Sequence, residues 1–170
     1  MKGKVVAILQ GGIGNQLFIY FSAKFSAIKL DRQIFFNIDF FENDRKYGRE
    51  LELPDIGINM SGRIQKTIFS SFLNRIIFSI SRFVPLHIVQ KERMYNEFTP
   101  VKTSVWGSIY ILGYFQNENY FINYRDDILL EIRSGALYNK CKFDYELLCE
   151  SEIKGRRIAI HLRSYHETGE

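Results

Sequence analysis

The sequence is poor in cysteine, proline and histidine. It has two cysteines, three prolines and three histidines in 170 residues. Two cysteines are too few for a disulfide scaffold, and the spacing of Cys141 and Cys149 suits one helical face, so we expect two reduced thiols. The histidines are far apart or lie near the end of the chain, and no Asp-x-Asp pair occurs, so the sequence shows no metal site.

Long apolar runs and a strong net charge are also lacking. The stretch from Thr103 to Asn117 carries no charge, but it contains two glycines and is too short to span a bilayer. The start, Met1-Lys2-Gly3-Lys4 and five apolar residues, does not resemble a secretion signal. The net charge of +4 implies no nucleic-acid partner. With 46% apolar residues, we expect a globular cytoplasmic protein with one substantial core.

The most informative stretch is Gly11-Gly12-Ile13-Gly14-Asn15-Gln16-Leu17-Phe18, directly after the apolar run Val5 to Leu9. This order predicts a strand, a tight loop and a helix that begins near Asn15, with Asn15 as its N-cap. Glycine backbone and free helix N–H groups favour phosphate binding. A dinucleotide fingerprint would begin the same way, but Leu17 stands where its third glycine belongs, so a nicotinamide- or flavin-dependent oxidoreductase is the weaker alternative.

The next segments predict a parallel α/β arrangement. Helical spacing of apolar residues continues to Ile28, and Gln33 to Ile38 reads as a second strand, which completes a β-α-β unit. Asp39 follows at the end of that strand, where ligands of open sheets bind, although a turn or cap is an equal interpretation. Residues 40–60 read as a surface loop, whose Arg45, Lys46 and Arg49 are either solvated or face an anionic ligand.

Apolar residues at helical spacing from Ile64 to Val84, with interspersed arginines and lysines, predict a basic amphipathic helix. One interpretation is a helix with one face in the core and solvated basic edges. The other is peripheral contact with an anionic membrane. Farther along, Asp126 to Glu150 has the pattern of two amphipathic helices.

A second motif, Gly113-Tyr114-Phe115-Gln116-Asn117-Glu118-Asn119-Tyr120-Phe121, follows the strand-like Ile109 to Leu112. Exposed aromatic rings beside Gln116 would suit a sugar, although core packing explains most of the four aromatic residues. Asn117 can cap the helix that follows. A third motif, His161-Leu162-Arg163-Ser164-Tyr165-His166-Glu167, ends the apolar run that begins at Ile158.

Together the three motifs resemble those of α-1,2-fucosyltransferases of glycosyltransferase family 11. The family usually has serine at the position of Asn117, a second arginine at Ser164 and aspartate at His166. The resemblance implies the GT-B plan of two Rossmann-like domains, with the sugar nucleotide between them. It also implies an inverting, metal-independent transfer of L-fucose from GDP-fucose to a galactoside hydroxyl, in the synthesis of surface polysaccharide.

The resemblance also assigns roles to residues. Arg163 would hold the diphosphate with help from His161, and its fork of donors suits that task. Donor or substrate contacts would come from Gly11, Gly12, Gly14, Asn15, Gln16, Tyr114, Gln116 and Ser164. Glu167 or His166 would accept the proton of the acceptor hydroxyl, unless both are ordinary loop residues.

By the same resemblance, residues 1–150 form the N-terminal domain and residues 151–170 begin a second, truncated domain. We therefore expect this chain alone to be poorly soluble or inactive. The changes at Ser164 and His166 leave a second alternative open, a degenerate, non-catalytic relative that binds a glycan or nucleotide. A lipid-linked acceptor would place the protein at the inner face of the cytoplasmic membrane.

Overall fold

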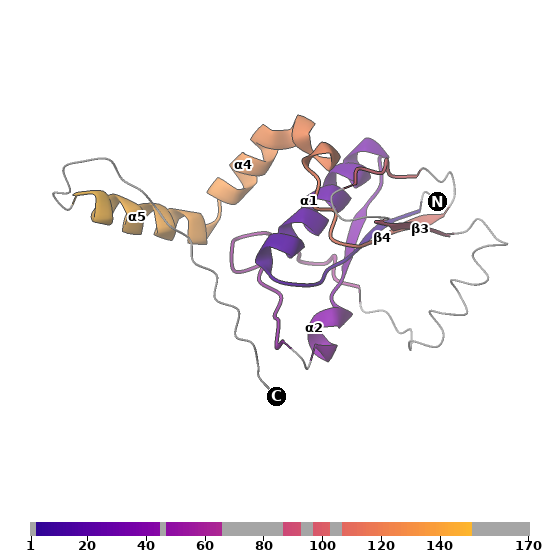
Figure 1. Cartoon of the computed structure of the whole chain (residues 1–170), viewed down its shortest axis with the longest axis horizontal. Coiled ribbons are helices and arrows are strands. Elements are labelled where there is room, and N and C mark those ends of the chain that lie inside the picture. Colours follow the sequence, from indigo (N-terminus) through magenta and orange to yellow (C-terminus); the bar gives the residue numbers. More distant parts are fainter. Residues whose placement is uncertain (1–2, 45–46, 66–86, 93–96, 103–106, 151–170) are drawn as a thin grey trace.

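A computed structural model describes residues 3–44, 47–65, 87–92, 97–102 and 107–150. Its centre is a sheet of four parallel strands in the order β2-β1-β4-β3 (Figure 1). The strands are β1 (Val5–Ile8), β2 (Ile34–Asn37), β3 (His87–Lys91) and β4 (Ser108–Leu112). The parallel α/β arrangement predicted from the sequence is confirmed, whereas β3 was not predicted.

Helix α1 (Ile13–Lys29) connects β1 to β2, as the β-α-β prediction required. It begins two residues before Asn15, and the prediction of Asn15 as its N-cap was wrong. The N-cap is Gly12, with φ −78° and ψ 176°, and no side chain caps the helix. Asn15 lies within the first turn, where its Oδ1 accepts a hydrogen bond from the distant Gln116 instead of from the helix backbone.

The core lies between α1 and one face of the sheet. Strand register places Ile34 and Ile109 on either side of Val5, so these three side chains share that face. All three are at least nine-tenths buried. Tyr20 of α1 stacks on Phe36 of β2, with ring centroids 5.6 Å apart. The helix therefore rests over β1 and β2, and its N-terminus is held near the end of β1.

The segment after β2 corrects the prediction of a surface loop. It begins with the short helix α2 (Asp39–Asn43), and its apolar side chains Leu53, Ile58 and Met60 are at most 3% exposed. Their burial extends the core, because they belong to the same cluster as the α1 and sheet residues.

The predicted basic helix does not begin at Ile64. The Phe36 N–H donates to the Arg63 carbonyl over 2.9 Å, and the Gln65 N–H donates to the Phe36 carbonyl over 2.8 Å. These bonds hold residues 63–65 extended beside β2, so helix is excluded there. The rest of the predicted helix, residues 66–84, lies outside the described residues.

Short helical segments follow β4: η1 (Glu118–Tyr120), η2 (Ile122–Tyr124), α4 (Arg125–Arg133) and α5 (Ala136–Glu150). The predicted pair of helices is confirmed, and α4 and α5 extend away from the sheet (Figure 1). Asn117 caps η1 as predicted, because its Oδ1 accepts from the Asn119 N–H over 2.9 Å. Among the described segments, no helix is long and apolar enough to cross a membrane.

A polar cluster fastens α4 to α1. The Tyr20 hydroxyl donates to Glu131 over 2.7 Å, and Lys24 forms an ion pair with the same carboxylate. Burial, followed by the hydrogen bond to Glu131, raises the pKa of Tyr20 far above its usual value. The hydroxyl therefore stays protonated and donates throughout the physiological pH range.

Candidate functional site

Two of the three sequence motifs meet at the carboxyl ends of β1 and β4. These strands are neighbours in the sheet, so the loops that leave them emerge side by side. Gln116 Nε2 donates to Asn15 Oδ1 over 2.5 Å, which joins residues 101 positions apart in the sequence. The loop after β1, the first turn of α1 and residues 113–117 after β4 thus form one corner, which we call the glycine corner.

Gly11 is required by the shape of this corner. Its φ is +78°, a conformation that side chains disfavour, and a Cβ there would lie 2.6 Å from Asn15 Nδ2. The Asn15 amide therefore lies directly over the Gly11 backbone. This close approach keeps Asn15 Oδ1 in position for Gln116.

The first turn of α1 offers backbone donors at this corner. The Gln16 N–H donates to the Gly12 carbonyl over 3.0 Å, so the N–H groups of the three residues before it have no partner within the helix. The first turn carries no acidic residue. Gly14 is exposed, with no atom within 4 Å of the place where a Cβ would be. These features suit an anionic group, because the helix dipole adds partial positive charge.

Arg49 completes the positive character of the glycine corner. Its Nη1 lies 2.7 Å from the position that a Cβ on Gly12 would occupy. The Arg49 N–H donates to Asp44 over 3.4 Å, and the guanidinium lies 5.4 Å from the centre of the Tyr47 ring. From the sequence, Arg49 was either a solvated residue or one that faces an anionic ligand. The structure places its charge at the helix N-terminus.

Gln16 lies in the interior and holds the Arg49 loop against the corner. Its Nε2 donates to the carbonyls of Gly11 and Glu50, each over 2.9 Å, and its Oε1 accepts from the Glu52 N–H over 3.0 Å. The side chain is completely buried. Contact between Gln16 and the donor substrate stays a prediction, but the side-chain amide already makes hydrogen bonds within the protein.

The second motif turns sharply to present Gln116. Gly113 has φ +138° and Phe115 has φ +53°, and Phe115 is fully buried. A positive φ costs a non-glycine residue about 1 kcal/mol, so core packing of Phe115 must offset strain in this loop. Glu92 holds the turn, because its Oε2 accepts from the Tyr114 N–H over 2.8 Å. Nothing in the sequence distinguished Glu92.

The two side chains that this loop offers to a ligand differ in exposure. Tyr114 is 37% exposed, as expected for an aromatic contact to a sugar. Gln116 Oε1 is shielded from solvent and has no hydrogen-bond partner among the described residues. Phe115, Tyr120 and Phe121 belong to the core or pack against it, which confirms the core interpretation for most of the four aromatic residues.

The other predicted residues are placed as follows. Asp39 is the first residue of α2 and accepts a hydrogen bond from Asn37 Nδ2 over 2.9 Å. The third motif lies outside the described residues, so the roles of its five site residues stay predictions: His161, Arg163, Ser164, His166 and Glu167. Leu17, at the position of the missing fingerprint glycine, is partly buried against the core.

Comparison with known proteins gives one informative relative. An α-1,2-colitosyltransferase of Escherichia coli is 26% identical to this chain over 125 residues. The chain is related to a glycosyltransferase. The match covers 73% of this chain and 43% of the relative, so the chain spans less than half of that protein's length. No family model matches the chain, and no solved structure shows significant similarity to it.

Proposed function

We propose that this chain is the N-terminal part of an inverting GT-B glycosyltransferase that transfers L-fucose from GDP-fucose to a galactoside hydroxyl. The observation that carries the proposal is the hydrogen bond between Asn15 and Gln116. It joins two motifs, each of which resembles the same transferase family, at the edge of a parallel sheet where ligands bind. The relationship to a glycosyltransferase supports the glycosyl-transfer part of the proposal.

In this proposal the glycine corner forms one wall of the cleft and faces the diphosphate. Arg49 and the free N–H groups of α1 provide positive charge there. Arg163, with His161, holds the diphosphate from the other wall and stabilises the negative charge of the leaving GDP without a metal. Ser164 supplies a hydrogen bond but no charge. Glu167 or His166 accepts the proton of the attacking acceptor hydroxyl.

The donor sugar has a second candidate, which the relative's name favours. Colitose is L-fucose without its 3-hydroxyl group, so both sugars offer the same methyl group and ring. A site that hydrogen-bonds the 3-hydroxyl should reject colitose by roughly 10⁴-fold, whereas an apolar site would discriminate by only about 10²-fold. The ratio of kcat/KM for the two donors therefore shows whether a polar group hydrogen-bonds the 3-hydroxyl.

The test uses the protein encoded by the complete gene, with GDP-fucose and GDP-colitose as donors and N-acetyllactosamine as acceptor. We expect transfer from GDP-fucose in the presence of EDTA, to give an α-1,2 linkage by NMR, with the higher kcat/KM for GDP-fucose. A higher kcat/KM for GDP-colitose would instead identify colitose as the transferred sugar. A folded protein that binds GDP but transfers neither sugar would favour the non-catalytic alternative.

A further inference from the structure

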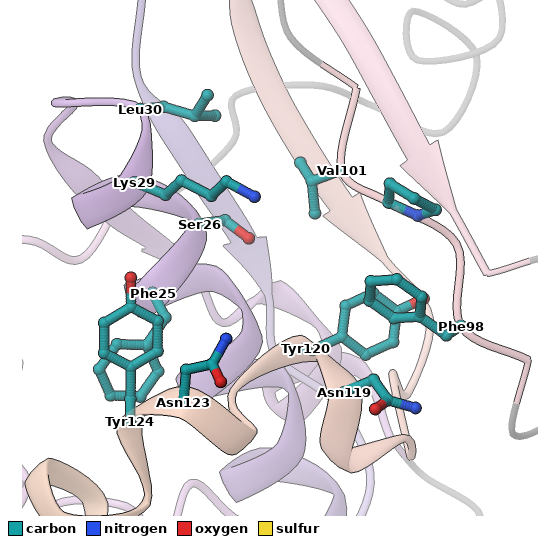
Figure 2. Close-up of a pocket in the computed structure, with 11 residues that line it drawn as sticks. Phe25, Ser26, Lys29, Leu30, Phe98, Val101, Asn119, Tyr120, Asn123 and Tyr124 are labelled. Carbon is teal, nitrogen blue, oxygen red and sulfur yellow. The ribbon is translucent and has the colours of Figure 1, made fainter.

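A cavity of about 320 Å³ lies away from the glycine corner, between the C-terminal half of α1, residues 98–101 and the segment η1–η2 (Figure 2). Cavities of this size hold small ligands. Ser26, on its rim, is fourteen residues after Gly12, or about 20 Å farther along the helix axis at the usual rise. The glycine corner and this cavity are therefore separate places on the molecule.

Aromatic pairs form two walls of the cavity. Phe25 and Tyr124 stack with their centroids 4.1 Å apart, and Phe98 lies 4.9 Å from Tyr120 on the opposite side (Figure 2). The Tyr120 hydroxyl accepts from the Thr99 N–H over 2.9 Å, which fixes that wall. The walls are thus formed before any ligand arrives. Rigid aromatic side chains suit the apolar faces of sugar rings and cost little conformational entropy on binding.

Polar groups reach into the space between these walls. The side chains of Lys29 and Asn123 extend into the hollow in Figure 2. Neither has a side-chain hydrogen bond or ion pair within the described part of the chain, and no described lining residue is acidic. A ligand here would therefore meet an amide and the positive charge of Lys29. On the opposite wall, burial, with contributions from the charges of Glu92 and Glu97, raises the pKa of Tyr120. Lys29 also interacts favourably with the helix dipole, because it lies in the last turn of α1. That interaction does not explain why a cavity lies beside Lys29.

One short segment connects the cavity to the glycine corner. Gln116 contacts Asn15 at the corner, and Asn119, three residues later, lines the cavity. Three residues span at most about 10 Å. A chain of sugars could therefore contact both places along residues 116–124.

We propose that this cavity binds an acidic sugar unit of a glycan, outside the place where the new bond forms. The aromatic walls select a pyranose ring, Asn123 hydrogen-bonds its hydroxyls, and Lys29 pairs with its carboxylate. The choice of a glycan rests on the proposed function, since an acceptor polysaccharide would present such units. The binding itself needs neither the donor nor transfer.

The test is binding of two sugars that differ by one acidic unit, 3′-sialyllactose and lactose, without any donor. We expect saturation-transfer NMR to show 3′-sialyllactose in contact with aromatic protons, at millimolar affinity. Lys29→Met should weaken 3′-sialyllactose binding about tenfold, as expected for loss of one charge-assisted hydrogen bond, and leave weak lactose binding unchanged. Asn123→Ala should weaken both sugars.

The matched control is Lys140→Met, which removes an exposed lysine of α5. Absence of 3′-sialyllactose binding would overturn the proposal, and so would equal affinities in wild type and Lys29→Met. Displacement of the sugar by GDP would also overturn it, because the cavity would then hold a nucleotide. Transfer to N-acetyllactosamine, which has no acidic unit, is measured separately on the wild-type protein, so failure of this proposal and failure of the proposed function give different results.

Discussion

Replacement of Gln16 by leucine is expected to lower the free energy of unfolding by about 4 kcal/mol. The side chain is completely buried and serves the Gly11 and Glu50 carbonyls and the Glu52 N–H. Leucine fills similar space but leaves three backbone groups without partners, each at a cost of roughly 1–3 kcal/mol. Urea denaturation followed by far-UV circular dichroism measures the difference.

Asn15→Ala is the matched control for this prediction. Asn15 lies one position earlier in the same helix turn but is only partly buried, and among the described residues its Oδ1 has a single partner, Gln116. We expect it to cost less than about 1.5 kcal/mol. Equal losses for the two variants would contradict the assignment of Gln16 as the residue that holds the Arg49 loop.

Arg49→Ala is expected to lower kcat/KM of the complete protein roughly 10- to 100-fold. Its guanidinium lies beside Gly12, where the uncapped N-terminus of α1 already favours an anion. Loss of a hydrogen bond from a charged donor to the diphosphate costs about 1.5–3 kcal/mol, which corresponds to that range. Steady-state kinetics with varied GDP-fucose measures the effect.

Two variants show whether charge and position explain the result. Arg49→Lys keeps the charge without the forked donor and should recover part of the activity. Arg133→Ala removes an exposed arginine of α4 and should behave as wild type. A wild-type kcat/KM in Arg49→Ala would show that the side chain does not contact the donor.

The strand, glycine loop and helix could be predicted because their signals are local. A β-branched run, a group of glycines and then apolar residues at helical spacing indicate a strand, a loop and a helix from neighbouring residues alone. An apolar run followed by a glycine likewise identified the strand before Gly113. The sequence therefore predicted that each motif directly follows a strand, but not that the two strands are neighbours in the sheet.

Contacts between distant segments could not be predicted in this way. No local pattern shows that Asn15 would accept from Gln116 and so leave the N-cap to Gly12. The roles of Gln16 and Arg49 also depend on contact between the start of α1 and a loop more than thirty residues farther along the chain, to which Arg49 belongs. A buried glutamine at the start of a helix and an arginine in a polar loop have the same sequence signature as solvated residues.

Assignment as a GDP-sugar transferase is tested by GDP binding to the protein encoded by the complete gene, measured by calorimetry with and without excess EDTA. We expect micromolar GDP binding that EDTA does not change, that NAD does not compete for, and that Arg163→Ala abolishes. A folded protein that binds no GDP would contradict the assignment as a GDP-sugar transferase, and so would one whose GDP binding requires a metal.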